Sequence, residues 1–148
     1  MLRARIWEVL EPAAEGDRVS RIVDQVILTL IWLNIAAVVL ESVEYLHERY
    51  ADFFYALEVV SVALFSLEYF LRIWSCVSDP RYRGAVIGRL KFALTPLAVI
   101  DLLAIAPAYF PAMGVDLRTL RIFRSLRIFR MAKLTRYNRA LATLGKVL

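Results

Sequence analysis

The chain has 148 residues, of which 60% are hydrophobic and 22% are charged, and its mean hydropathy is +0.58. Many of the charges lie inside or beside long apolar runs, which is typical of a membrane protein and argues against a soluble domain. The single cysteine, Cys76, excludes an internal disulfide bond. The net charge is +5, but seven of the nineteen cations lie in residues 117–137 and the rest of the chain is slightly acidic.

The sequence lacks the motifs that carry catalysis or bind cofactors. It contains no glycine-rich phosphate loop, no Ser/His/Asp set and no cluster of metal ligands. The one histidine, His47, falls in a predicted external loop, where a solvated surface residue is the expected role. We therefore expect neither an enzyme nor a bound cofactor. We also expect no nucleic-acid partner, because the basicity is confined to one apolar segment.

Residues 1–23 are expected to lie in the cytoplasm and at the membrane interface, with a short interfacial helix over residues 2–10 that holds Trp7 at the surface. Four apolar segments follow, and about 20 helical residues suffice to cross the hydrocarbon core of a bilayer. The predicted spans cover about residues 24–45, 53–75, 92–110 and 116–136. Residues 137–148 form a short amphipathic tail. The expected fold is an all-α, antiparallel bundle of four transmembrane helices.

The charges of the connections predict how these helices are oriented. Cations precede the first span and fill the second connection, whereas the first connection is mostly acidic and the third has no cation. The cations concerned are Arg3, Arg5, Arg18, Arg21, Arg81, Arg83, Arg89 and Lys91. Because cytoplasmic loops are enriched in Lys and Arg, we expect both termini in the cytoplasm of a multi-pass cell-membrane protein.

The fourth segment has a cation at every third position, with almost only apolar residues between them. This cation ladder consists of Arg118, Arg121, Arg124, Arg127, Arg130, Lys133 and Arg136. Each three-residue step turns about 300° on an α-helix, so the charges wind around the helix and leave no apolar face. On a 3₁₀ helix they form a single stripe. Both geometries suit a helix enclosed by protein and water rather than one lying on a membrane surface.

A buried ladder needs acidic partners on neighbouring spans, because each central arginine costs about 2.5–3.5 kcal/mol in the bilayer. Glu58 and Glu68 are ten residues apart, which places them near one face of the second span and about 15 Å apart along its axis. Phe65 lies between them on this face. Asp101 on the third span falls at a depth similar to that of Glu68. Two carboxylates on different helices are therefore predicted to converge at one level.

The first span adds two polar residues, and two simpler readings of the second span stay open. Asn34 and Glu41 are seven residues apart and share a face, with Glu41 nearer the outside. Glu68 and Arg72 could form only an ordinary helical pair four residues apart, and Phe65 taken alone could be a packing residue. Neither reading explains the other acids on these spans.

Together these segments resemble the voltage-sensor domain of voltage-gated cation channels, most closely that of voltage-gated potassium channels. The likeness covers about residues 24–145. The segment ALEVVSVALFSLEYFLRIWSC resembles the family's outer Glu, Phe, Glu and Arg, and VIDLLAIAPAYF resembles its Asp and later Pro. The segment RIFRSLRIFRMAKLTRY resembles its arginine series. Ala98 departs from the pattern, because many potassium channels have a polar residue three positions before the Asp.

The resemblance implies a voltage-sensing role. Phe65, Glu68 and Asp101 correspond to the family's charge-transfer centre, and depolarisation would move the fourth helix outward past it to gate a pore absent from this chain. The tail YNRALATLGKVL resembles the start of the helix that joins sensor to pore. The expected partners are the lipid bilayer and the pore domain of a tetrameric full-length channel. The fragment itself is expected to be monomeric.

Other readings fit fewer residues. A self-contained voltage-gated proton channel also has four spans, but its family typically has an Asp where this chain has Asn34, and three arginines followed by Asn. A voltage-sensing phosphatase would need a catalytic Cys motif, which this sequence lacks. A basic membrane-surface or nucleic-acid-binding protein leaves Glu58, Glu68 and Asp101 unexplained. The proton channel is therefore kept as the alternative.

Overall fold

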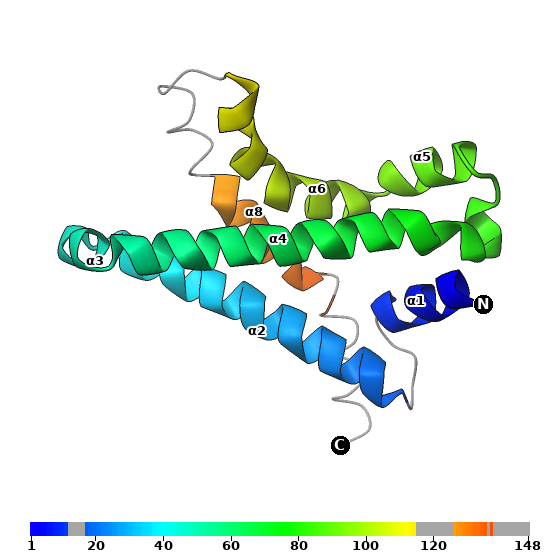
Figure 1. Ribbon diagram of the computed structural model, residues 1–148, viewed down its shortest axis with the longest axis horizontal. Helices are drawn as coiled ribbons and strands as arrows, with labels where there is room; N and C mark the ends of the chain where they lie inside the picture. Colours follow the sequence, from blue (N-terminus) through cyan, green and yellow to red (C-terminus); the bar gives the residue numbers. More distant parts are fainter. Residues whose placement is uncertain (12–16, 115–125, 136, 138–148) are drawn as a thin grey trace.

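The computed structural model describes residues 1–11, 17–114, 126–135 and 137, and this part of the chain is helical without any β-strand. The all-α prediction is confirmed for these residues. The elements are α1 (Leu2–Leu10), α2 (Arg18–Glu41), α3 (Glu44–Arg49), α4 (Ala51–Ser75), η1 (Cys76–Ser78), η2 (Pro80–Tyr82), α5 (Ile87–Ala93), α6 (Pro96–Tyr109), η3 (Phe110–Met113), η4 (Leu126–Ile128) and α8 (Phe129–Ala132) (Figure 1).

Three of the described helical segments are long and apolar enough to cross a membrane. They are Arg18–Glu41 with 24 residues, Ala51–Ser78 with 28 and Pro96–Met113 with 18. Large apolar side chains such as Trp32, Leu67 and Phe70 are more than half exposed on these segments, which fits contact with lipid. Much of the fourth predicted span, including Arg118, Arg121, Arg124 and Arg136, lies outside the described residues.

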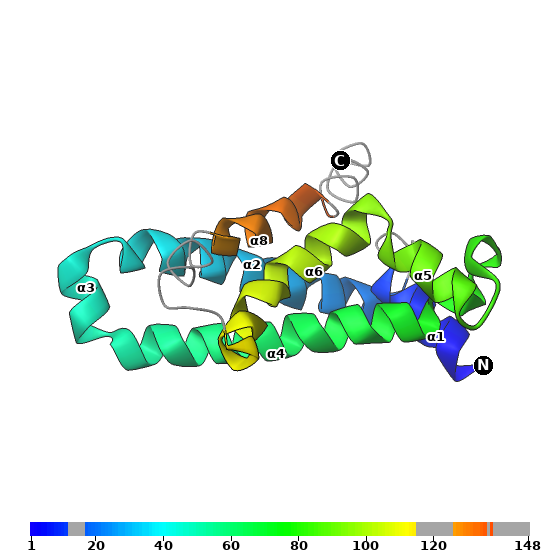
Figure 2. The same cartoon turned by 90° about the horizontal axis from the view of Figure 1, so that it is seen from above.

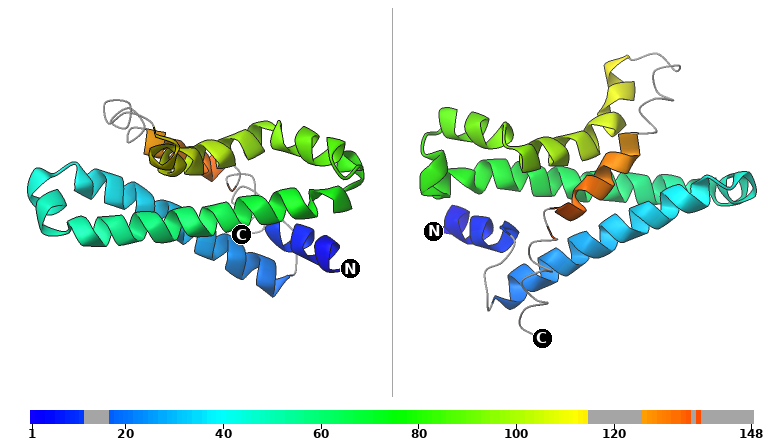
Figure 3. Two further views of the ribbon diagram at one scale, coloured as in Figure 1. Left: turned by 45° about the horizontal axis from the view of Figure 1, so that its top comes forward. Right: turned by 180° about the vertical axis from the view of Figure 1, so that it is seen from behind.

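The long helix α4 is the element around which the others are arranged. Figure 2 shows α3 joining α2 to one end of α4, and α1 lying beside the other end. Helix α6 runs along α4, and the short helix α8 contacts both α6 and α2. The right-hand view of Figure 3 shows α8 between these two helices. The ladder residues of η4 and α8 are therefore surrounded by α2, α4 and α6.

The helix starts follow from local capping chemistry. The carboxylate of Asp17 accepts a hydrogen bond of 3.1 Å from the backbone N–H of Val19, which caps α2. The predicted third span, about residues 92–110, is interrupted after Ala93. Thr95 caps α6 through a hydroxyl that accepts from the N–H of Ala98 at 3.4 Å, and Pro96 occupies the first helical position. Proline has no N–H to bond to the preceding turn, so α5 and α6 are separate helices.

Helix α1 packs against α2 and α4 rather than standing alone. The predicted helix over residues 2–10 is confirmed, and Trp7 on it is half-buried rather than fully exposed. Its indole packs edge-on against Tyr82 and Phe92, with ring centroids 6.4 and 5.5 Å away. The hydroxyl of Ser20 also donates a hydrogen bond of 3.1 Å to the carbonyl of Val9, which ties α1 to α2.

Candidate functional site

Three ladder cations lie within the described residues, and each meets acids from other helices. Arg127 is in η4, Arg130 is in α8, and Lys133 follows the last residue of α8. Arg130 is 2% exposed and Lys133 is 1% exposed. Buried cations of this kind are stable only when they are paired and hydrogen-bonded, so their partners define the site.

Arg127 lies nearest to α3 and pairs mainly with the first span. Its Nη1 is 2.9 Å from a carboxylate oxygen of Glu41 at the end of α2. Its Nε is 3.8 Å from Glu58 on α4, which is a weaker contact. The side chain is about a quarter exposed, so this pair is partly solvated and stabilises less than a fully buried one would.

Arg130 has the most complete set of partners among the described ladder residues. Its two terminal nitrogens bind the two carboxylate oxygens of Glu58 at 2.7 and 2.6 Å, a bidentate geometry. It also donates to Asn34 Oδ1 at 2.8 Å and to the Ala104 carbonyl at 3.1 Å. The amide nitrogen of Asn34 donates to the hydroxyl of Ser61 at 2.7 Å, which orients its oxygen toward the guanidinium.

Lys133 binds the two acids that were predicted to converge. Its ammonium lies 2.8 Å from Glu68 and 3.4 Å from Asp101. The same nitrogen sits 4.2 Å from the centroid of the Phe65 ring, within the range of a cation–π contact. Phe65 is 1% exposed. One cation therefore contacts the aromatic ring and both carboxylates at once.

Arg72 is the second cation at these two acids. Its guanidinium lies 2.6 Å from Glu68 and 3.0 Å from Asp101, so it bridges α4 and α6. It also donates to the backbone carbonyl of Leu10 at 3.1 Å and to the hydroxyl of Tyr137 at 3.4 Å. The last turn of α1 thus supplies a carbonyl to this buried cation, as expected at the negative end of a helix.

The described contacts form two networks along α4. The first network contains Arg127, Arg130, Glu41, Glu58 and Asn34, toward α3. The second network contains Lys133, Arg72, Glu68 and Asp101, toward α1. Phe65 precedes Glu68 on α4 and follows Glu58, so its ring lies between the acids of the two networks.

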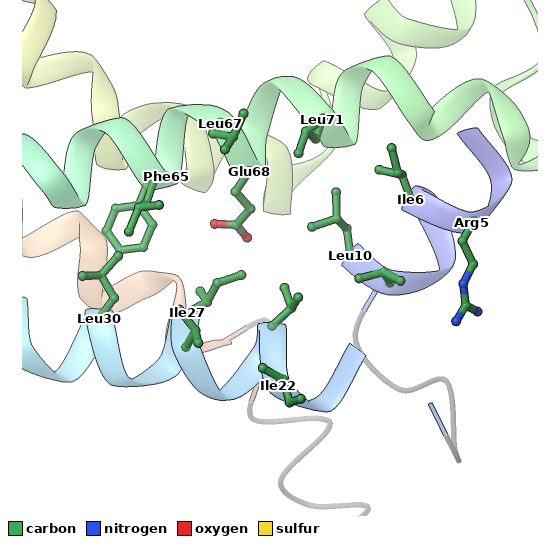
Figure 4. A pocket seen from close by; sticks show the side chains of 14 residues that line it. Arg5, Ile6, Leu10, Ile22, Ile27, Leu30, Phe65, Leu67, Glu68 and Leu71 are labelled. Carbon is green, nitrogen blue, oxygen red and sulfur yellow. The ribbon is translucent and has the colours of Figure 1, made fainter. Parts of the chain in front are cut away.

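Two cavities adjoin these networks and differ in polarity. A cavity of about 510 Å³ between α4 and the end of α6 is lined by Glu58, Arg127 and Tyr109 among others. A groove of about 400 Å³ between α1, α2 and α4 is lined almost entirely by apolar side chains. Figure 4 shows Phe65 and Glu68 pointing from α4 into this groove toward α2. The first network therefore borders a cavity whose wall includes charged and hydroxyl groups, whereas the groove beside the second network is almost entirely apolar.

His47 is partly exposed, in keeping with the surface position expected from the sequence, but it lies in the short helix α3 rather than in a loop. Its ring Nδ1 is 3.4 Å from Glu41, and its side chain is 45% exposed. Glu41 also binds Arg127 through its other oxygen. The histidine therefore adjoins the first network.

Several contacts of these networks were absent from the sequence-based prediction, among them that between Arg130 and the backbone carbonyl of Ala104. The Leu10 carbonyl is a backbone group, which no residue pattern could indicate. Tyr137 was predicted to begin the tail, yet it is 1% exposed and its hydroxyl lies 3.4 Å from Glu68. Ser61 orients Asn34 and is fully buried. Its spacing of seven residues before Glu68 was a usable signal, because it places both side chains on one face of α4.

Helices long enough to cross a bilayer, with buried acid–cation pairs between them, define a multi-pass membrane protein that keeps charges among its helices. Residues 20–148 match the family model described as "Ion transport protein". The chain therefore belongs to this family and is a member of the voltage-gated cation channel superfamily. Membership of an ion channel family implies a transport protein rather than an enzyme.

Similar proteins that are named as potassium channels support this assignment. A protein of Rhodopseudomonas palustris named as a potassium channel protein is 33% identical over 152 residues, covering 99% of this chain and 36% of the relative. The KQT member 1 voltage-gated potassium channel of Xenopus laevis is 36% identical over 67 residues, or 45% of this chain and 10% of the relative. KQT member 4 of Rattus norvegicus is 36% identical over 75 residues, or 51% and 11%. The chain thus spans only a minor part of each relative.

Proposed function

We propose that this chain is the voltage-sensing module of a voltage-gated potassium channel. The observation that carries the proposal is the arrangement of three successive ladder cations. Arg127 and Arg130 pair with acids on one side of Phe65, and Lys133 pairs with acids on the other side. A helix whose cations already occupy two successive sets of acids can shift by one step and exchange partners without exposing a charge to lipid.

The proposal extends to the organisation of the whole chain. Residues 24–136 form a four-helix sensor, residues 1–23 and 137–148 lie on the cytoplasmic side, and both termini are cytoplasmic. The sensor gates a pore domain that joins the full-length channel into a tetramer, while this chain alone is monomeric. The potassium assignment is supported by relatives whose names describe potassium channels.

The electrical energy available to the ladder is large enough to drive a switch. One charge that crosses the whole membrane field gains about 2.3 kcal/mol per 100 mV. Three or four cations moved past Phe65 would therefore supply about 7–9 kcal/mol per 100 mV. A two-state equilibrium shifts from 1:99 to 99:1 with about 5.5 kcal/mol. The ladder needs to carry only part of its charge through the field.

The order of the pairs supports the outward position of the fourth helix. With α3 external and α1 cytoplasmic, Arg127 and Arg130 lie outside Phe65, and Lys133 occupies the charge-transfer centre. On hyperpolarisation Arg130 and then Arg127 would replace Lys133 at Glu68 and Asp101. The ladder cations that precede Arg127 in the chain would follow them to the outer acids.

Gating currents recorded under voltage clamp from the chain at a cell surface test this function. Arg127→Gln and Arg130→Gln should each reduce the charge moved per molecule, because each removes a cation that crosses the field. Arg49→Gln is the matched control, since Arg49 is an exposed arginine on α3 outside both networks. Charge movement that is unchanged in both ladder variants, or absent from the unmodified chain, would contradict the proposal.

A further inference from the structure

Asp24 is an acid of α2 that the proposed mechanism does not yet use. It precedes Ile27, Ile31 and Asn34 at steps of three and four residues, so it lies on the face of α2 that these residues share. Ile27 is 8% exposed, Ile31 is fully buried and Asn34 is 4% exposed. Asp24 itself is half-buried. Its carboxylate therefore faces the other helices rather than lipid.

Asp24 lies near the second network. Its carboxylate is within electrostatic reach of Arg72, Glu68 and the hydroxyl of Tyr137. Asp24 and Asn34 are ten residues apart on α2, and Glu58 and Glu68 are also ten residues apart on α4. Ten helical residues correspond to about 15 Å along the axis, so the two pairs have the same separation in depth. Because Arg130 binds both Asn34 and Glu58, Asp24 and Glu68 are at comparable depths.

One oxygen of this carboxylate has no donor in the described part of the chain. Asp24 Oδ1 is inaccessible to solvent and accepts no hydrogen bond there. Arg21, three residues earlier on α2, is exposed, and among the described residues it donates no hydrogen bond to this oxygen. Leaving a buried acceptor without a donor costs more free energy than a single hydrogen bond contributes to stability. Such a group is expected to find a partner in another conformation of the molecule.

The charges of the described residues point to the same conclusion. In the first network, Glu41 and Glu58 are matched by two ladder cations, Arg127 and Arg130. In the second network, Glu68 and Asp101 are likewise matched by two cations. Asp24 adds a third acid to the second network and leaves it one cation short. The ladder is the source of cations that can move.

We propose that Asp24 is the acid that receives Lys133 when the fourth helix moves one step toward α1. Arg130 then takes the place of Lys133 at Glu68 and Asp101. A step of three residues is about 4.5–6 Å along the helix, a displacement that a flexible lysine side chain can follow. Asp24 thereby stabilises the inward position of the ladder. The inference rests on the proposed voltage-sensing function. It means that α2, through Asp24, contributes an inner acid in addition to those on α4 and α6.

Asp24→Asn tests the assignment by gating currents from the full 148-residue chain. The variant should raise the equilibrium constant for the outward over the inward position about tenfold or more at a given potential. This is the scale of one charge-assisted hydrogen bond. The charge–voltage curve should therefore move to more negative potentials. The total charge moved should stay the same, because Asp24 itself does not cross the field. Asp24→Glu should restore most of the original curve.

Glu8→Gln is the matched control for surface potential. Removing any negative charge on the cytoplasmic side also displaces the curve toward negative potentials, and Glu8 is exposed on α1 outside both networks. The displacement with Asp24→Asn must exceed that with Glu8→Gln. Equal displacement, while the unmodified chain still moves charge, would overturn the role of Asp24 and leave voltage sensing intact. No charge movement in the unmodified chain would overturn both proposals.

Cross-linking supplies a second test that does not need the asparagine variant to fold. In a Cys76→Ser background, Asp24→Cys combined with Lys133→Cys should form a disulfide faster at negative than at positive potential. Ile22→Cys with Lys133→Cys is the control pair, because Ile22 lies two residues away on α2 and is 59% exposed. Equal rates at both potentials for the Asp24→Cys pair would contradict the inference.

Discussion

Arg130 and Glu58 form a bidentate pair between α8 and α4, with both carboxylate oxygens within 2.7 Å of guanidinium nitrogens. Arg130 is 2% exposed, so its charge depends on this partner and on Asn34. The pair also fixes the depth of the fourth segment relative to α4. A change at either residue should alter the position of the ladder before it alters the fold of the other helices.

Glu58→Gln should destabilise the outward position of the ladder. Removing one partner of a buried pair leaves the other charge uncompensated, and the loss is about 3–5 kcal/mol when nothing relaxes. In the outward position Glu58 forms a bidentate pair with Arg130, which Asn34 also binds. We expect this arrangement to be stronger than the pair that Glu58 makes with the cation that replaces Arg130 in the inward position, so the charge–voltage curve should shift to more positive potentials by at least a tenfold change in equilibrium. Gating currents measure this shift.

The control for Glu58→Gln is Glu44→Gln. Glu44 is exposed in α3, and its substitution removes an equal charge from the same end of the molecule. Its effect should be confined to a small change in surface potential, screened at physiological salt. A shift no larger than this control would show that Glu58 does not hold Arg130 in the outward position.

Arg72→Met should destabilise the folded protein. It leaves Glu68 and Asp101 with Lys133 alone, which is expected to lower the free energy of unfolding by about 3–5 kcal/mol. Thermal unfolding of the purified chain in detergent micelles, followed by circular dichroism, measures the loss. Arg49→Met serves as the control, because exposed substitutions change stability by only about 0.5 kcal/mol. Similar unfolding of both variants would contradict the central role of Arg72.

The positions of the acids could be predicted because helix geometry converts residue spacing into depth. Glu68 and Asp101 were expected at one level, and both contact Arg72 and Lys133. The double role of Arg72 could not be separated from an ordinary pair with Glu68, because a spacing of four residues fits both. The contact of Arg72 with the Leu10 carbonyl could not be predicted either, because a backbone group leaves no signature in the sequence.

The break in the third predicted span shows a different limit. Residues 92–110 are apolar enough to read as one segment, yet Thr95 and Pro96 start a new helix. The hydropathy of the segment dominated the prediction, although Thr followed by Pro is itself a helix-start signal. Tyr137 was assigned to the tail because the ladder ends at Arg136, and its burial depends on a tertiary contact with Glu68.

Phe65 should influence the ladder through its ring face as well as its bulk. The Lys133 ammonium lies 4.2 Å from the ring centroid, and a cation–π contact contributes about 0.5–2 kcal/mol. Phe65→Leu should therefore shift the charge–voltage curve to more positive potentials, whereas Phe65→Trp should shift it to more negative ones, because Trp binds cations best. Ile105→Leu, a conservative change at a buried apolar residue of α6, should leave the curve in place. Equal shifts for the two Phe65 variants would argue for packing alone.

The proton channel alternative makes a separate prediction about the chain on its own. As a sensor, the purified chain in liposomes should show no voltage-dependent proton flux under a potassium diffusion potential, measured with an internal pH dye. Asn34 carries no titratable group, and its amide is held by Arg130, Ser61 and Leu30, so it offers no proton acceptor in the middle of α2. A protonophore added at the end of each recording confirms that the dye and the gradient are intact. Proton flux that depends on voltage and is lost in Arg130→Gln would favour the self-contained proton channel, because the same ladder would then be opening a pathway within the chain itself.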